Sequence, residues 1–441
     1  MRVLLVGSGG REHALAWKLA QSSTVDLHAA PGSPGIARLG ECHPIRAEDA
    51  EGLLALSHSL DVDLVVVGPE APLVAGLADV LRPAGVAVFG PSAAAAAIEG
   101  SKAFAKEVLA AAGVPTAATL PIARPPCVVK ADGLAAGKGV HICRTQEELD
   151  GALRAVTALG GAFVVEELLE GPEVSLFGVC DGYDAVALPA SRDFKRVDDG
   201  DRGPNTGGMG SFAPVPGLDE AVVTELIDSV HRPVLAELGR RGAPFVGLLY
   251  AGLMLTADGP RVLEFNCRFG DPETQSVLPL LDADLLELLG AAAAGELAGV
   301  AVEQSPPAQQ VGGEGERPSE SGGVPQAGPE AAAVTVVLAA GGYPETSDRG
   351  SAISGVDDAE ATGALVFHAG TALQGDQLVT NGGRILGVTG LGATIAEART
   401  AAYDAAGLIE FDGVRRREDI ALAAAEGRMV SAFTPSSDGG S

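Results

Sequence analysis

The first hundred residues alternate between short apolar runs and segments with helical spacing. The apolar runs are Val3–Val6, Leu64–Val67 and Val86–Phe89. Each run ends in a turn rich in glycine or proline, and a helix is predicted after the first turn, over Glu12–Gln21. Runs that are apolar at every position indicate strands buried on both faces, as in a parallel sheet covered by helices. The pattern predicts an α/β fold with an N-terminal doubly wound parallel sheet, whose ligands bind at the carboxyl ends of the strands.

The rest of the chain divides where the composition changes. Between residues 303 and 331, Pro, Gly, Gln, Glu and Ser replace almost all large apolar residues, which is typical of a flexible linker or insertion. We therefore predict domains over residues 1–100, 101–302 and 332–430, joined by a linker over 303–331 and followed by a tail over 431–441. Later strands are expected at Cys127–Lys130, Phe163–Glu167, Glu173–Cys180, Arg261–Phe265, Val334–Ala339 and Leu386–Val388. Later helices are expected at Lys102–Ala112 and Ile395–Ala406.

The charge and cysteine content limit the classes of partner. The 441 residues include 58 acidic and 30 basic side chains, a net charge of −28, so neither nucleic acid nor an anionic membrane is an expected partner. The five cysteines are scattered and form no CxxC pair, which favours a reducing compartment over a disulfide framework or a zinc site. The first apolar run is too short for a signal peptide and no apolar span of 18 residues follows, so we expect a cytoplasmic protein.

The first glycine-rich turn is a candidate anion site. Residues Gly7–Glu12 read GSGGRE between a predicted strand and a predicted helix. Free backbone N–H groups and the helix dipole attract phosphate at such a position. The dinucleotide fingerprint is not met, because Glu12 occupies the position of its third glycine. The turn predicts a phosphate site, and a tight turn without a ligand is the alternative.

A second glycine-rich segment carries two lysines. Residues Val128–Val140 read VVKADGLAAGKGV, so a strand leads to Lys130 and a loop places Lys138 between Gly137 and Gly139. Glycines let backbone N–H groups approach phosphate oxygens, and a lysine adds a positive charge. The Walker A spacing is absent. A phosphate-binding loop is predicted, with a glycine-rich hairpin that binds no nucleotide as the alternative.

A third segment combines oxygen ligands with an arginine. Residues Leu263–Gln275 read LEFNCRFGDPETQ, and Glu264 and Asn266 share one face of the predicted strand. A carboxylate and an amide oxygen suit Mg²⁺, and Arg268 on the same face could hold an anion by two hydrogen bonds. The residues between them are apolar, which argues against the alternative of a surface salt-bridge cluster.

Other segments are less specific. The acidic residues of Phe163–Phe177 could accept hydrogen bonds from a nucleobase or ribose, or could form a solvated loop. The glycine-rich stretch Ser191–Phe212 is either an active-site loop or a disordered one. Arg384 could meet an anion or belong to a structural hairpin. The seven histidines show no metal-binding spacing, and we predict no special role for them.

Taken together, these sequence motifs resemble those of the glycinamide ribonucleotide synthetase (phosphoribosylamine–glycine ligase) family of the ATP-grasp superfamily. The similarity runs from Met1 to about Ile420, interrupted by the linker. RFGDPETQ together with NTGGMG is its most specific part, and GSGGREH, GSKAFAK, FHAGT and TNGGRILGV add to it. The family usually has histidine at the position of Phe194.

The resemblance implies an enzyme that forms a C–N bond between a carboxylate and an amine. ATP, glycine and 5-phospho-β-D-ribosylamine would give glycinamide ribonucleotide, ADP and phosphate through glycyl phosphate, in the second step of de novo purine (IMP) biosynthesis. The second domain would be an α+β ATP-grasp domain with a lid subdomain at about 122–188, and the third a small, mostly β domain. Mg²⁺ or Mn²⁺ would be the cofactor, with ATP as co-substrate.

The resemblance also assigns site residues. For ATP it implies Lys102, Lys130, Gly133, Gly137, Lys138, Gly139, Glu166, Glu167, Leu168 and Glu173. For the metal it implies Glu264 and Asn266. For the other substrates it implies Gly9, Gly10, Arg11, Glu12, Glu70, Asn205, Thr206, Gly207, Gly208, Met209, Gly210, Arg268, Asp271 and Glu273. For catalysis it implies Lys130, Lys138, Asp193, Lys195 and Arg268.

There are two alternatives to this function. The first is a superfamily ligase that acts on another purine intermediate. The second is a non-catalytic nucleotide-binding regulator of Rossmann type, against which the pair Glu264 and Asn266 argues, because simple binding needs no such metal ligands. The sequence leaves open a transient contact with the enzyme that makes phosphoribosylamine.

Overall fold

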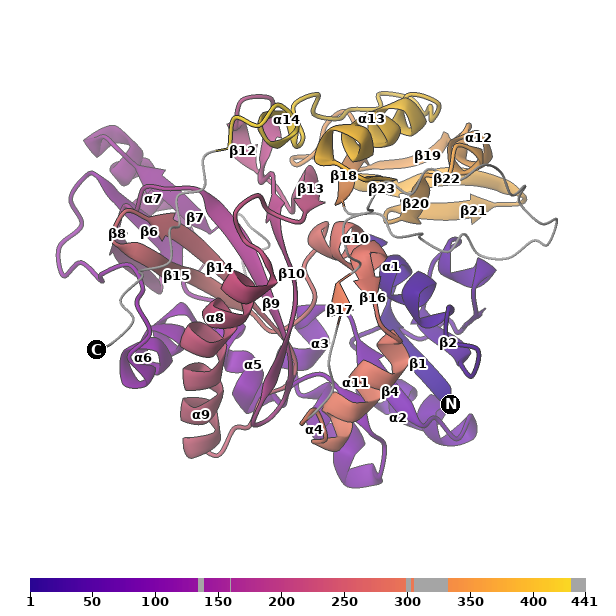
Figure 1. Ribbon diagram of the computed structural model, residues 1–441, viewed down its shortest axis with the longest axis horizontal. Coiled ribbons are helices and arrows are strands. Elements are labelled where there is room, and N and C mark those ends of the chain that lie inside the picture. The colour runs from indigo at the N-terminus through magenta and orange to yellow at the C-terminus, as the bar shows by residue number, and fades with distance from the viewer. Residues whose placement is uncertain (134–138, 159, 299–302, 305–331, 430–441) are drawn as a thin grey trace.

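The computed structural model describes residues 1–133, 139–158, 160–298, 303–304 and 332–429. The N-terminal region is a five-stranded parallel sheet in the order β3-β2-β1-β4-β5 (Figure 1). Its strands are β1 (Arg2–Gly7), β2 (Asp26–Pro31), β3 (Glu41–Cys42), β4 (Leu64–Val67) and β5 (Val88–Phe89). Its helices are α1 (Gly10–Leu19), α2 (Ala50–Ser59), α3 (Glu70–Val74), α4 (Leu77–Leu81) and α5 (Ala93–Gly100). The predicted parallel, doubly wound sheet is confirmed.

Both faces of this sheet are buried, which explains why its strands are apolar at every position. Val3 and Leu5 of β1 pack in one core cluster with Leu15 of α1. Leu4 and Val6 point the other way, into the core that α2 to α5 help to form. Each of these four strand residues is fully buried, so the strand has no solvent-facing side to carry polar residues.

The centre of the molecule is an eight-stranded sheet in the order β15-β14-β9-β10-β13-β18-β23-β20. Its strands are β9 (Glu173–Asp181), β10 (Ala185–Asp193), β13 (Gly210–Ala213), β14 (Val246–Thr256), β15 (Gly259–Asn266), β18 (Ala332–Ala339), β20 (Leu365–His368) and β23 (Arg384–Gly392). Antiparallel pairing of Gly210 with Val336 joins β13 to β18, so the sheet continues from the second region into the third. Such pairing between distant segments has no local sequence signal.

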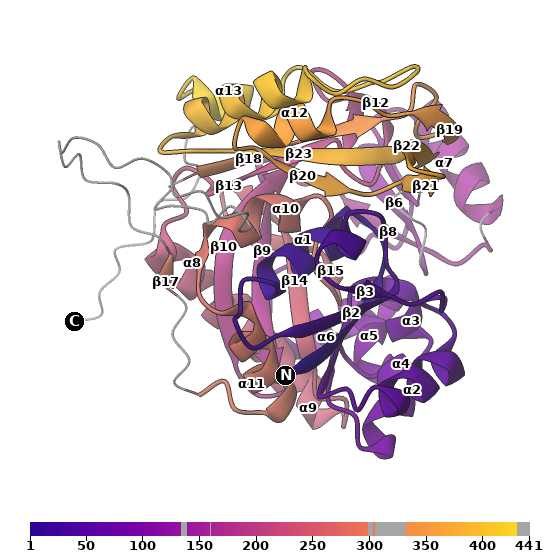
Figure 2. The same cartoon turned by 90° about the vertical axis from the view of Figure 1, so that its right-hand side faces the viewer.

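Smaller elements surround this sheet. On the left of Figure 1, a three-stranded sheet of β6 (Cys127–Ala131), β7 (Val140–Cys143) and β8 (Phe163–Glu167) packs with α7 (Gln146–Ala158) around a core of its own. Figure 2 shows the C-terminal strands and α13 (Ile395–Ala406) stacked above the N-terminal sheet. The remaining C-terminal elements are β19 (Asp348–Ala352), α12 (Val356–Ala361), β21 (Thr371–Gln374), β22 (Gln377–Gly382) and α14 (Leu422–Ala425). The remaining central elements are α6 (Lys102–Ala112), β11 (Arg196–Asp198), β12 (Arg202–Asn205), α8 (Glu220–Leu226), α9 (Arg232–Arg240), α10 (Glu273–Val277), β16 (Leu281–Asp282), α11 (Leu285–Ala294) and β17 (Glu303–Gln304).

Strand register collects polar residues at one end of one face of the central sheet, which is called the polar face below. Ser175 of β9 pairs with Ser191 of β10 on one side and with Gly252 of β14 on the other, and Gly252 pairs with Glu264 of β15. Because directly paired residues point to the same face, Glu264 and both serines lie on one side of the sheet. The alternate residues, such as Leu176 and Phe265, are buried in the core that also includes residues of α6, α8 and α9. Polar groups of distant segments are thus collected on a single surface.

Among the described residues, no helix combines the length and apolar character that crossing a bilayer requires.

Candidate active site

Glu264 lies among lysines at the end of the polar face. Its carboxylate is 3.5 Å from the ammonium nitrogen of Lys102, the first residue of α6. Burial alone would raise the pKa of Glu264, but Lys102, Lys195 and Lys130 outweigh burial and lower it to about 2. Glu264 is therefore ionised near neutral pH. Asn266, on the same strand face, offers an amide oxygen that accepts a hydrogen bond from Arg268 at 3.3 Å.

Lys130 reaches the central sheet from the smaller sheet. Its ammonium group is buried, donates to the carbonyl oxygen of Leu263 at 2.8 Å and lies 2.6 Å from Glu166. The second oxygen of Glu166 lies 2.7 Å from Lys106. The carboxylate of Glu166, only 2% exposed, is thus shared by two lysines and positions Lys130. Its predicted contact with the nucleoside stays a prediction.

A third group of charges surrounds Lys195. The Lys195 ammonium lies 2.7 Å from Glu173 and 2.9 Å from Asp193, which the antiparallel register of β9 and β10 brings together. Burial would lower the pKa of Lys195, but Asp193 and Glu173 outweigh it and raise the pKa well above its ordinary value. Next to this group, Ser175 contacts the hydroxyl of Tyr250 at 2.9 Å and the carboxylate of Glu273 at 3.4 Å.

Glu273 leads to a pH-dependent prediction. Burial and, secondly, the Asp193 carboxylate raise the pKa of Glu273 to about 7, while Lys195 opposes them. Between about pH 4.5 and 7 the native protein therefore keeps a proton that the unfolded chain has lost, so the group lowers the free energy of unfolding as pH rises through this window. We expect Glu273→Gln, which has no proton to lose, to gain stability relative to the parent protein over this range.

The prediction is checked by urea unfolding at pH 5, 6, 7 and 8. Glu287→Gln, at an exposed position of α11, serves as the control and should follow the parent curve. A constant stability difference between Glu273→Gln and the parent protein across the four pH values would contradict the assignment.

Arg268 is held by carboxylates from the N-terminal region. Its guanidinium lies 3.2 Å from Glu70 and 3.5 Å from Glu99, and it donates to the carbonyl oxygen of Phe269. Burial alone would lower the pKa of Arg268. The carboxylates of Glu99 and Glu70 outweigh burial and raise this pKa above its ordinary value. Glu70 also lies 3.8 Å from Arg11, so it bridges two arginines.

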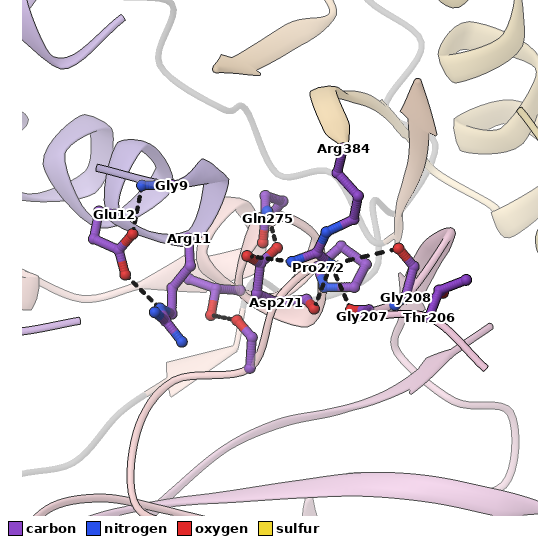
Figure 3. A network of polar contacts seen from close by, with 12 residues as sticks. Gly9, Arg11, Glu12, Thr206, Gly207, Gly208, Asp271, Pro272, Gln275 and Arg384 are labelled. Atoms are coloured by element: carbon purple, nitrogen blue, oxygen red, sulfur yellow. Dashed lines mark hydrogen bonds and ion pairs between the residues drawn. The ribbon is translucent and has the colours of Figure 1, made fainter. Parts of the chain in front are cut away.

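A network around Asp271 joins three parts of the chain (Figure 3). Arg384, at the start of β23, lies 2.7 Å from the Asp271 carboxylate and donates to the backbone oxygens of Asp271, Gly207 and Gly208. Gln275 donates to the other Asp271 oxygen at 2.9 Å. Gly208 has φ +106°, and a Cβ there would lie 2.3 Å from the Pro272 ring, so glycine is required for this close approach.

The N-terminal turn is occupied by a side chain of its own helix. The Glu12 carboxylate accepts a hydrogen bond from the Gly9 backbone N–H at 2.6 Å and caps α1. It also pairs with Arg11, whose guanidinium donates to the Phe269 carbonyl oxygen at 3.3 Å. A Cβ on Gly7 or Gly68 would collide with Glu12, so the carboxyl group fills the turn tightly. The turn therefore carries the ion pair of Arg11 and Glu12, and the Gly9 N–H is bound to Glu12.

The remaining predicted residues are distributed as follows. Gly137 and Lys138 lie outside the described residues, and Gly133 and Gly139 are the described residues on either side of them. Glu167 and Leu168 line an open hollow with Arg144, Asp258 and Arg261. Asn205 pairs with Arg196, Thr206 donates to the carbonyl oxygen of Lys195, and Met209 and Gly210 make backbone hydrogen bonds with Phe194. Gly10 begins α1, and its Cβ position would meet Gln275.

The Phe194 ring packs against two arginine side chains and one aromatic ring. Its ring lies 5.0 Å from the guanidinium carbon of Arg417 and 5.9 Å from that of Arg192, and 6.2 Å from the ring of Phe212. The loop that carries Lys195 is therefore anchored by stacking and cation–π contacts at this position.

Several residues of the site were not predicted. Lys106 lies one turn after Lys102 on α6, and this i, i+4 spacing was the available signal. Ser175, Tyr250 and Glu99 carried no local signal, because only strand pairing and helix packing bring them to the site. The arrangement as a whole can bind polyphosphate through its lysines, a divalent cation through its oxygen ligands and a small zwitterion between Arg268 and its acidic groups.

Comparison with known proteins gives consistent matches along the chain. Models described as phosphoribosylglycinamide synthetase match as the N domain over residues 1–99, the ATP-grasp (A) domain over 100–274 and the C domain over 333–423. The chain is 48% identical to a phosphoribosylamine–glycine ligase of Streptomyces coelicolor over 96% of this chain and 100% of the relative. It is 45% identical to that of Brucella melitensis over 97% and 99% of the two chains.

Solved structures agree with these sequence matches. The crystal structure of a phosphoribosylamine–glycine ligase from Thermotoga maritima is 34% identical, with a TM-score of 0.77 over 95% of this chain and 100% of that one. A biotin carboxylase domain of 2-oxoglutarate carboxylase from Hydrogenobacter thermophilus is 17% identical, with a TM-score of 0.68 over 98% and 96% of the chains, and shares the fold.

Proposed function

Because this chain belongs to the phosphoribosylglycinamide synthetase family, we propose that the polar face of its central sheet and the network around Asp271 form one active site. The enzyme is an ATP-grasp ligase that joins glycine to 5-phospho-β-D-ribosylamine, a step of purine biosynthesis. ATP is converted to ADP and phosphate in the reaction. The observation that carries the site assignment is the position of Glu264, 3.5 Å from Lys102 and directly after Leu263, whose carbonyl oxygen accepts a hydrogen bond from Lys130.

The family uses a divalent metal with ATP, and we propose Mg²⁺ or Mn²⁺ at Glu264 and Asn266. The fit rests on the donor chemistry, since a carboxylate kept ionised by its surroundings and an amide oxygen suit such ions. When bound, the metal would offset the charge of the ATP phosphates. Lys102 and Lys130 would contact those phosphates, and the shared Glu166 would hold Lys130 in place. Gly133, Gly139 and Lys138 would cover them from the loop.

Glycine would lie beside Arg268, with its carboxylate toward the guanidinium and its ammonium toward the carboxylates of Asp193 and Asp271. The glycine carboxylate would attack the γ-phosphorus of ATP, giving glycyl phosphate and ADP. The amine of phosphoribosylamine would then attack the acyl carbon, and phosphate would leave. Lys195, held by Glu173 and Asp193, supplies a fixed positive charge near this point. Catalysis would depend on positioning and electrostatics, without a covalent enzyme intermediate.

Phosphoribosylamine would lie between the N-terminal turn and the loop Asn205–Gly210, which Arg384 ties to Asp271. The support for this location is that both segments bind the stretch from Phe269 to Asp271. Arg11 donates to the carbonyl oxygen of Phe269, and Arg384 joins Gly207 and Gly208 to Asp271 (Figure 3). We also keep as predictions a cytoplasmic location and the absence of nucleic-acid and membrane partners. A transient contact with the enzyme that supplies phosphoribosylamine stays open.

Replacing Arg384 tests this location. Arg384→Met removes the charged group that holds the loop to Asp271, and each lost charge-assisted hydrogen bond costs about 1.5–3 kcal/mol. We expect the KM for phosphoribosylamine to rise by about tenfold or more, with a smaller change in the KM for ATP. Steady-state kinetics with each substrate varied in turn measures both constants.

The matched control is Arg349→Met, at an exposed position of β19 in the same C-terminal region. Equal changes in the KM values for ATP and phosphoribosylamine, or no change in either, would refute the proposed location.

A further inference from the structure

We propose that this protein has a second metal site, for a transition-metal dication such as Zn²⁺, formed by His28, Glu41 and His43 at the edge of the N-terminal sheet. The site lies on strands β2 and β3 and uses none of the residues assigned above to ATP, glycine or phosphoribosylamine.

Strand geometry brings the three side chains together. In the parallel pair β2 and β3, His28 is in register with Glu41, and the two-residue alternation places His43 on the same face. The Nδ1 atom of His28 is 3.0 Å from Nε2 of His43 and 3.9 Å from a carboxylate oxygen of Glu41. All three candidate ligand atoms lie within 4.8 Å of one another. Ligands of a tetrahedral Zn²⁺ are about 3.3 Å apart, given bonds of about 2.0–2.1 Å, so small side-chain movements would complete the site.

A carboxylate stands behind the buried histidine. His28 is only 6% exposed, and its Nε2 has no hydrogen-bond partner among the described residues, although an Asp26 oxygen lies 3.5 Å away. The other Asp26 oxygen is fixed by Arg2 at 2.9 Å. Metal-bound histidines usually direct their second ring nitrogen toward a carboxylate or carbonyl oxygen. Coordination through Nδ1 would leave the proton on Nε2, facing Asp26, which is the arrangement this geometry favours.

The donor set selects the class of ion. Two imidazoles and one carboxylate suit Zn²⁺, Co²⁺, Ni²⁺ or Cu²⁺, whereas Mg²⁺ prefers oxygen ligands alone. The Glu41 side chain is 69% exposed and His43 is half-buried, so an ion can enter from solvent and keep a water as its fourth ligand. Cys42, which lies between Glu41 and His43 in the sequence, points to the opposite face toward Gly32. It is therefore not expected to take part.

The proposed site would give two of the histidines a role that was not predicted from the sequence. His28 and His43 are separated by fourteen residues, in a spacing that no common metal motif uses. Only the pairing of β2 with the short strand β3 shows that they meet. A plain hydrogen bond between the two imidazoles is the competing explanation, and it predicts no metal binding.

Isothermal titration with ZnCl₂ tests the site, using the full chain without a histidine tag, stripped of metal and kept in excess MgCl₂ to saturate the oxygen-ligand site. We expect one equivalent of Zn²⁺ to bind, and His43→Gln or Glu41→Gln to weaken this binding by about tenfold or more. Titration with Co²⁺ should give a visible absorption band in the parent protein that His43→Gln lacks.

Two controls should leave the affinity unchanged: His58→Gln, an exposed histidine of α2, and Cys42→Ser. Circular dichroism and thermal unfolding verify that each variant is folded, and Glu41→Gln, at an exposed position, decides the result if His43→Gln does not fold. Failure of the parent protein to bind Zn²⁺, or equal affinity in the parent and both ligand variants, would overturn the proposal.

Discussion

Glu264→Gln is expected to lower the rate of ligation by on the order of a thousandfold while the protein stays folded. The substitution keeps the shape of the side chain but removes its negative charge. In the parent protein, Lys102, Lys195 and Lys130 stabilise that charge. A neutral amide is a weaker ligand for a divalent cation, and it no longer offsets the charge of Lys102, whereas Lys130 keeps Glu166 and Lys195 keeps Glu173 and Asp193. Among the described residues the one ion pair of Glu264, with Lys102 at 3.5 Å, is lost, so the thermal midpoint should fall while the protein stays folded.

The measurement is the rate of ADP formation at saturating ATP, glycine and phosphoribosylamine, together with the thermal unfolding midpoint. Glu264→Ala should give at least as large a loss of rate. Glu287→Gln, an exposed glutamate on α11, is the matched control and should keep the parent rate. A Glu264→Gln protein with near-parent turnover would show that this carboxylate has no role in the reaction.

Lys130→Met should also reduce ligation by on the order of a thousandfold, since it removes a charge assigned to the ATP phosphates. Here a loss of stability accompanies the loss of rate. The Lys130 ammonium lies 2.6 Å from Glu166, whose carboxylate is 2% exposed, and removing one member of a buried ion pair leaves the other poorly compensated. Lys106, at 2.7 Å, compensates Glu166 only in part.

A double variant separates the two effects. In Lys130→Met with Glu166→Gln, no uncompensated carboxylate remains, so the thermal midpoint should recover part of the loss. The rate of ADP formation should stay low, because the ammonium group is still missing. Recovery of the rate together with stability would mean that Lys130 acts only through the fold and has no contact with ATP.

Strands β1 and β4 of the N-terminal sheet could be predicted because each contains a short, buried run that is apolar at every position. Val3–Val6 and Leu64–Val67 are apolar at every position, and the structure places strands over Arg2–Gly7 and Leu64–Val67. The helices predicted at Lys102–Ala112 and Ile395–Ala406 are confirmed at the same bounds. The junction between β13 and β18 could not be predicted, because the pairing of Gly210 with Val336 depends on tertiary structure alone.

In the candidate site, too, local patterns could be predicted from the sequence and contacts between distant segments could not. Glu264 and Asn266 could be recognised as neighbours because strand periodicity is local, and the buried Phe265 between them confirms the expected alternation. The partners of the predicted charges could not be recognised in this way. Tyr250 faces Ser175 across paired strands, and Lys106 meets Lys130 through Glu166 because α6 packs beside β8. Pairing in space, rather than any motif, decides these contacts.

In the function proposed above, one active site couples ATP cleavage to the joining of glycine and phosphoribosylamine. The most direct test measures ADP release from ATP and Mg²⁺, with phosphoribosylamine generated in situ, and omits glycine or phosphoribosylamine in turn. We predict rapid ADP release only when both substrates are present, with glycinamide ribonucleotide detected by mass. Rapid ADP release without glycine, or the absence of that product when both substrates are present, would contradict this coupling.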